Sequence, residues 1–220
     1  MTLRRVRELI FDATRVSFNS VRTKPIIVAA AIMFAGTAAA QTADESHRGK
    51  EQTFSARLSG FNEVHFVTGD GTPQSLPALR GAVSTTGRGS FRAKIDDNAR
   101  IIDYELSYEA LEGTVTQGHI HFGQRHTVGG IVVWLCQTSA NPAPAAVASV
   151  TPECPQEGTV TGTITPAQVL AQTAQGIAVG EFEEVVRAIR NRAAYANVHS
   201  SLFPQGEIRG HIEDGRDRRR

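Results

Sequence analysis

The sequence predicts an all-β fold, a sandwich or barrel of about eight mainly antiparallel strands with two short helices. The chain has 220 residues, of which 40% are hydrophobic and 20% are charged. This balance is typical of a globular protein and not of a disordered or fibrous one. It contains 20 Gly and 9 Pro but only 2 Met, which favours a protein rich in loops. Strand-like runs separated by turn-forming residues follow one another along most of the chain.

The predicted strands are runs in which apolar and polar residues alternate, or short runs that are apolar throughout. A turn-forming segment, Asp96-Asp97-Asn98, separates two of the alternating runs and indicates a hairpin. The run at 130–136 is continuously apolar, and the run at 158–164 is rich in Thr, which favours strands. In chain order the expected strands cover residues 54–58, 90–95, 101–108, 115–122, 130–136, 158–164, 195–199 and 207–212.

Two helical segments interrupt this pattern. Thr165 followed by Pro166 matches a helix N-cap with proline at the first helical position, which predicts a short helix over residues 166–172. Residues 181–192 carry apolar side chains at helical spacing, with acidic residues early and arginines late, as the helix dipole favours. We interpret that apolar stripe as core packing.

The first 40 residues resemble an export signal. Basic residues precede a nine-residue apolar run at 26–34, and three alanines ending at Ala40 follow it, as in a signal peptide with an A-x-A cleavage site. The alternative is an uncleaved anchor or a buried helix. We therefore expect a signal peptide at 1–40, a flexible linker at 41–52, a folded domain at 53–213 and a basic disordered tail at 214–220. The apolar run is shorter than the roughly 20 residues that span a bilayer, so we expect a periplasmic or secreted protein without a membrane span after cleavage.

The charge distribution argues against a nucleic-acid partner. The whole chain carries a net charge of +1. Residues 41–215 hold 13 basic and 19 acidic side chains, a net charge of −6, because the basic groups concentrate at the two ends. A domain with this charge lacks the basic surface that binds nucleic acid.

Cys136 and Cys154 are the only two cysteines. An oxidising compartment favours a disulfide between them, and the alternative is two free thiols. Such a bridge closes a loop rich in Pro and Ala, and it stabilises the fold by roughly 3 kcal/mol in the chain-entropy model.

Histidines on the predicted strands form the most informative pattern. Successive side chains of a strand point to opposite faces, so His119 and His121 share one face while Ile120 and Phe122 share the other, apolar face. The same alternation turns Ile208 and Ile212 inward near the C-terminus. It places six polar residues on the outer side of the last two strands: Tyr195, Asn197, His199, Glu207, Arg209 and His211.

These last two strands form a predicted hairpin. In the register we expect, His199 lies opposite Glu207, Asn197 opposite Arg209, and Tyr195 opposite His211. If the His119 strand lies beside this hairpin, two imidazoles from an H-x-H pair and a third from His199 or His211 could bind copper or zinc. The alternative is an outer polar face held by His–Glu and Glu–Arg pairs. We expect His47, His65 and His126 to be solvated loop residues.

At these residues the sequence resembles the CHRD (chordin-like) domain family over residues 53–212. The resemblance rests on three motifs: F-x-A-x-L-x-G-x-x-E-V at 54–64, H-I-H-x-G at 119–123, and Y-x-N-V-H followed by P-x-G-E-I-R-G at 195–210. His65 stands where the family often has Pro. The resemblance implies an exported immunoglobulin-like β-sandwich or barrel with limited similarity to Cu/Zn superoxide dismutases, and it implies no established catalytic activity.

Two functions from different classes follow. The first is a non-catalytic exported binding or structural module for an unknown protein or surface ligand, recognised through the face of Tyr195, Asn197 and Arg209 or through the loop 137–157. The second is a copper-binding, dismutase-like protein in which Arg209 steers anions toward the histidines. No zinc-organising set with a bridging His and an Asp is evident, which weakens the case for catalysis more than the case for metal binding.

Overall fold

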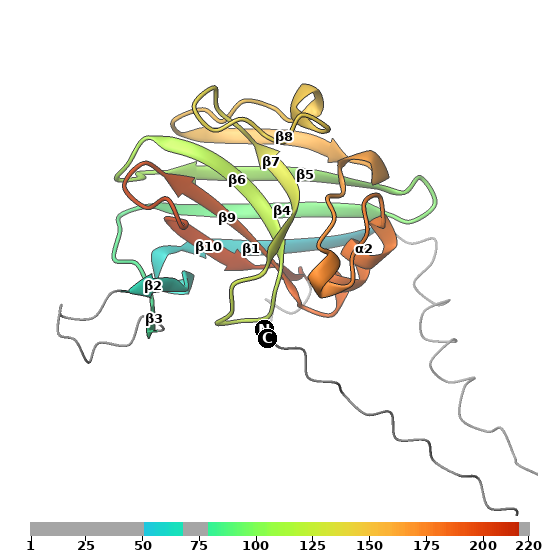
Figure 1. Cartoon of the computed structure of the whole chain (residues 1–220), viewed down its shortest axis with the longest axis horizontal. Helices are drawn as coiled ribbons and strands as arrows, with labels where there is room; N and C mark the ends of the chain where they lie inside the picture. The colour runs from blue at the N-terminus through green and yellow to red at the C-terminus, as the bar shows by residue number, and fades with distance from the viewer. Residues whose placement is uncertain (1–50, 68–78, 216–220) are drawn as a thin grey trace, which may run out of the picture. The chain divides into compact units, whose positions relative to one another are not determined.

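The computed structural model describes residues 51–67 and 79–215. The expected signal peptide, His47 and most of the basic tail lie outside these residues. The main sheet runs in the order β7-β6-β9-β10-β1-β4-β5-β8, with β11 also pairing with β1, and every pairing is antiparallel (Figure 1). Its strands are β1 (Gln52–Ser59), β4 (Arg88–Asp96), β5 (Ile101–Glu109), β6 (Val115–Phe122), β7 (Gly130–Cys136), β8 (Gly158–Ile164), β9 (Ala194–Ser200), β10 (Ile208–His211) and β11 (Glu213–Asp214).

This sheet curls into a nearly closed barrel, which confirms the all-β prediction. The outer edge of β7 is not paired with β8. Instead its carbonyls accept hydrogen bonds from Tyr104 Oη at Leu135 (2.6 Å), from the Leu170 amide at Val132 (2.9 Å) and from the Gln172 side chain at Ile131 (2.6 Å). The segment that follows β8 therefore satisfies an edge that would otherwise be open to pairing.

The eight predicted strands are all present, and the structure adds three short ones. A two-stranded ribbon of β2 (His65–Val67) and β3 (Leu79–Gly81) stands apart from the main sheet, and β11 follows β10. His65 therefore lies in a strand, where the sequence predicted a loop. Its Nε2 lies 2.5 Å from the Gly206 carbonyl oxygen, so it is not simply a solvated residue.

One of the two predicted helices is an α-helix, α2 (Phe182–Arg190). The other is shorter than predicted: only Pro166–Gln168 is helical, as a 3-10 turn that begins after the predicted N-cap Thr165, and Thr165 and Gln168 form a capping box there. Further 3-10 turns cover Gly60–Asn62, Ala148–Val150 and Thr173–Gln175. No helix in the described part of the chain is both long and apolar enough to cross a membrane.

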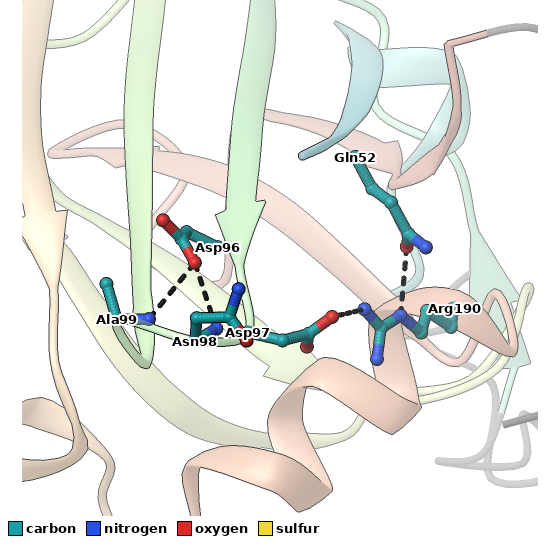
Figure 2. A network of polar contacts seen from close by, with 6 residues as sticks. All are labelled: Gln52, Asp96, Asp97, Asn98, Ala99 and Arg190. Atoms are coloured by element: carbon teal, nitrogen blue, oxygen red, sulfur yellow. Dashed lines mark hydrogen bonds and ion pairs between the residues drawn. The ribbon is translucent and has the colours of Figure 1, made fainter. Parts of the chain in front are cut away.

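Helix α2 is fixed to the sheet by a polar link as well as by its buried apolar side (Figure 2). Arg190 Nη2 lies 2.6 Å from Asp97 Oδ2 in the β4–β5 turn, and Arg190 Nε donates to Gln52 Oε1 at the start of β1 (3.0 Å). The turn itself is shaped by Asp96, whose Oδ1 accepts the amides of Asn98 and Ala99. Because the side chains of Arg190 and Asp97 are only 20% and 17% exposed, this ion pair is better shielded from solvent than an ordinary surface pair.

The barrel interior is filled by the alternating apolar side chains, including Phe91, Leu106 and Ile120, which are fully buried. Cys136 and Cys154 form the predicted disulfide at the end of β7. It closes the Pro- and Ala-rich loop, which carries no strand other than isolated bridges.

Candidate functional site

The polar residues singled out in the sequence lie together on the outer face of three neighbouring strands, β6, β9 and β10. His121 pairs with Tyr195, which pairs with His211; His119 pairs with Asn197, which pairs with Arg209. In the next row Gln117 pairs with His199. The hairpin register predicted from the sequence is confirmed for Asn197–Arg209 and Tyr195–His211, so the alternation rule placed these side chains on the correct face.

This face is buried, however, and not open to solvent. His119 is 0% exposed, Arg209 is 1% and Asn197 is 2%, and Tyr195, His121, His199 and Glu207 are buried too. The recognition surface proposed for Tyr195, Asn197 and Arg209 is therefore wrong, because no partner can reach those side chains. Strand alternation shows which residues turn away from the barrel interior, but it carries no information on which loops cover them.

Loops from distant parts of the chain form that cover through hydrogen bonds to the same residues. Arg209 donates from Nη1 to the Thr127 carbonyl (2.8 Å) and from Nη2 to the Gln124 carbonyl (3.2 Å). Glu207 accepts hydrogen bonds from the Thr85 hydroxyl and the Glu112 amide, both at 2.6 Å. Glu207 thus anchors two loops, whereas the alternative reading of the sequence paired it with histidine or arginine across the sheet.

Three imidazoles meet beneath this cover. The structure brings His119, His121 and His199 together so that one ring nitrogen from each lies within 4.8 Å of the others. His119 Nδ1 is 3.3 Å from His199 Nε2. Two nitrogens bound to one metal at about 2.0–2.1 Å in tetrahedral geometry are separated by about 3.3–3.4 Å. This pair of nitrogens therefore already has the spacing of two ligands of one ion.

The hydrogen bonds of two of these rings fix which of their nitrogens carries the proton and which keeps a lone pair. His121 Nδ1 lies 2.9 Å from the Gly129 carbonyl oxygen, and His199 Nδ1 lies 3.0 Å from the Pro204 carbonyl oxygen. A carbonyl oxygen can only accept, so in the neutral rings both Nδ1 atoms carry the proton and both Nε2 atoms keep a lone pair. The His199 Nε2 lone pair faces His119 Nδ1 (3.3 Å), and His121 Nε2 lies 3.1 Å from the side-chain amide of Asn197. Histidines that bind metals are usually oriented in this way, by a hydrogen bond from the ring nitrogen that faces away from the metal.

Burial keeps all three rings uncharged. Burial lowers the pKa of His119 well below its usual range, with smaller contributions from His199 and His121. It also lowers the pKa of His121 and of His199 to about 4. Neutral imidazoles offer lone pairs at neutral pH without losing a proton first.

His119 has no second polar partner. Its Nε2 is buried and makes no hydrogen bond within the described residues, and its ring stands edge-on to Trp134, with the centroids 4.3 Å apart. A buried polar atom without a partner is costly and calls for an explanation. If His119 Nδ1 binds an ion, the Nε2–H group can rest against the indole ring, a weak but favourable contact.

A positive charge lies close to the three histidines. The Arg209 guanidinium carbon is 3.4 Å from the centre of the Tyr195 ring, and Tyr195 stacks on His121 with 4.7 Å between ring centroids. His211 lies on the other side of this arginine, with Nε2 at 3.3 Å from Arg209 Nη2. His211 is therefore not part of the three-histidine group, and of the two candidates for a third ligand the structure brings in His199.

Glu63 and Trp134 also belong to this region, and the sequence did not assign them a role. Burial raises the pKa of Glu63 to about 8, although the Arg209 charge and a hydrogen bond from the Val64 amide act against that rise. Glu63 was visible as part of the opening motif, but nothing in that motif indicates that its carboxyl group is buried. Trp134 lies in a continuously apolar strand, where no alternation shows which face it joins.

Comparison with known proteins agrees with the motifs. No curated protein and no solved structure matched this chain. The family model for the CHRD domain matches residues 54–212, a range that contains the main sheet except β11 and the first two residues of β1, and that includes all three histidines of the group. The chain therefore belongs to the CHRD domain family.

Proposed function

We propose that this protein is an exported, non-catalytic CHRD module that binds one copper or zinc ion at the centre formed by His119, His121 and His199. One observation carries the metal assignment: three neutral imidazoles converge, and backbone carbonyls bind the Nδ1 atoms of two of them, which leaves the Nε2 lone pairs of these two rings directed away from the carbonyls. Copper and zinc are the ions that imidazole donors favour. The ion would link β6 to β9 and hold the covering loops, a structural role that requires no substrate access.

Export is supported by the disulfide and by the N-terminal sequence. The Cys136–Cys154 bridge is of the kind that persists in oxidising compartments. If the module has a protein or surface ligand, the disulfide-closed loop is the better candidate for contact, since it carries exposed side chains such as Val150. N-terminal sequencing of the protein recovered outside the cytoplasm should begin at Gln41. Full-length protein retained in the cytoplasm would contradict export.

The metal assignment is tested by the metal content of the mature protein, prepared without a His tag, exposed to copper and zinc and then desalted. We expect about one ion per chain in the wild type and a loss of most of it in His121→Ala or His199→Ala, because two imidazoles bind far more weakly than three. His47→Ala, which removes an imidazole outside the described residues, is the control and should keep the wild-type content. A wild-type protein without metal, or an equal content in His121→Ala, would reject the centre.

A copper-centred dismutase is the second candidate, since the same three histidines would hold the copper. The copper-loaded protein would then accelerate superoxide decay, and His199→Ala would abolish the effect. If the protein retains copper but does not accelerate superoxide decay, the dismutase function is rejected and the structural role of the metal is supported.

A further inference from the structure

The charges around the three histidines differ from those that a divalent ion requires. Within the described residues, the group that could hold a metal contains His119, His121 and His199 and no carboxylate or thiolate. All three donors are neutral, so the full charge of a bound ion would remain in a buried site. The cost of burying a charge grows with its square and is about fourfold larger for a divalent ion than for a monovalent ion of the same size.

A built-in positive charge makes this cost larger. Arg209 is 1% exposed, and its guanidinium is separated from His121 by Tyr195, which contacts both. Glu63, a carboxyl group that acts on Arg209, is itself buried and mostly protonated at neutral pH, so it offsets little of this charge.

The number of ligand atoms also favours a monovalent ion over a divalent one. Structural zinc sites are almost always four-coordinate, and the group here supplies three imidazoles. Asn197 Oδ1, a neutral amide oxygen, lies 3.1 Å from His121 Nε2 and could serve as a fourth donor. A d10 monovalent copper ion is stable at lower coordination numbers and needs neither a fourth ligand nor an anion.

We infer that the His119–His121–His199 centre selects Cu(I) over Zn(II) and Cu(II), because its neutral donor set lies beside a buried arginine. This inference rests on the proposed metal centre and adds the oxidation state of its ion. The selectivity is a property of the charges around the centre, so it should change when one charge is added without changing the shape of the site.

Asn197→Asp makes that change, since Asp and Asn have nearly the same size and this side chain already contacts His121. Asn98→Asp, at the exposed β4–β5 turn, introduces the same chemical change far from the centre and is the matched control. Binding of Cu(I) is measured by competition with a Cu(I)-specific chromophoric chelator, under ascorbate and without oxygen. A thiol assay checks that the disulfide stays intact, and Zn(II) and Cu(II) are measured against indicators of their own.

In the wild type we expect Cu(I) to bind at least about a hundredfold more tightly than Zn(II), and more tightly than Cu(II). In Asn197→Asp the Zn(II) affinity should rise at least about tenfold while the Cu(I) affinity changes by less than about threefold, and Asn98→Asp should match the wild type. The selectivity would be overturned if Zn(II) or Cu(II) bound as tightly as Cu(I), or if Asn197→Asp raised the affinities for Zn(II) and Cu(I) equally. Either result would still support the metal centre. Failure to bind any of the three ions would overturn the metal centre itself.

Discussion

Replacing Glu63 by Gln should change how the stability of the metal-free protein depends on pH. The folded state holds a proton on this carboxyl group far more strongly than the unfolded chain does, with a pKa of about 8 in place of 4.5. Between those values the native state binds more protons than the unfolded state, so the Glu63 contribution to stability is lost as pH rises. At about 1.4 kcal/mol per pKa unit, the loss between pH 5 and pH 7.5 is about 3 kcal/mol.

The buried histidines act in the opposite direction. His121 and His199 have folded-state pKa values of about 4, below the 6.5 of the unfolded chain. Their contribution is therefore present at neutral pH and is lost as pH falls below about 6.5, by about 2 kcal/mol for each group at pH 5. His119 and His211 also have lowered pKa values, so in the wild type the Glu63 effect offsets only part of the combined histidine effect. In Glu63→Gln only the histidine effect remains, so stability should rise more steeply with pH.

The measurement is urea-induced unfolding at pH 5 and pH 7.5 in the presence of a chelator, followed by the fluorescence of Trp134, the single tryptophan, and by circular dichroism. The free energy of unfolding of Glu63→Gln relative to the wild type should increase by about 3 kcal/mol over this interval. Glu105→Gln, an exposed carboxylate on β5, should shift it by less than about 0.5 kcal/mol. Parallel profiles for Glu63→Gln and the wild type would refute the buried protonated carboxyl group.

Three further changes test the architecture. Arg190→Met and Asp97→Ala should each lower the free energy of unfolding by about 1–2 kcal/mol, since the two side chains are partly shielded from solvent. A double-mutant cycle should give a coupling energy of about 1 kcal/mol between them. Additive effects would show that the ion pair is not formed. Joint replacement of Cys136 and Cys154 by Ser should cost about 3 kcal/mol in chemical denaturation, as expected for a loop whose ends are 18 residues apart, and an unchanged midpoint would contradict a stabilising bridge. Gly206→Ala should lower the free energy of unfolding by about 2–3 kcal/mol in thermal or urea unfolding. Gly206 has φ of 123°, and a Cβ there would lie 2.6 Å from the buried Glu63 Oε1. A variant as stable as the wild type would show that the turn can relax.

Much of the fold could be predicted because it depends on short-range patterns. Alternation of polar and apolar residues located most of the eight strands, and an apolar run and a Thr-rich run located those at 130–136 and 158–164. Matching inward with inward residues fixed only the parity of the C-terminal hairpin, and among the registers with that parity the expected one, with Asn197 opposite Arg209, is present. The capping signal at Thr165 was also correct, but the helix after it ended at Gln168. Beyond Gln168 the chain leaves the helical path, and Leu170 and Gln172 donate hydrogen bonds to carbonyls on the edge of β7. The residues of this segment do not by themselves indicate that such a tertiary contact forms.

The candidate site shows the same division. The sequence by itself determined that His119 and His121 share the outer face of one strand, and that His199 and Arg209 share the outer face of the C-terminal hairpin, because a strand has a period of two and paired strands match buried face to buried face. The sequence left open whether that strand lies beside the hairpin, and the pairing of β6 with β9 in the structure answers it. Only the tertiary structure decided that this face is buried, that His199 and not His211 joins the pair, and that Glu63 comes to lie near Arg209. Those outcomes depend on loops that pack on the face, both the β6–β7 loop that contains Gly129 and loops from distant positions in the chain, such as those of Thr85 and Glu112. Burial is set by what packs on a strand from elsewhere, and the strand's own residues specify only the side on which that packing occurs.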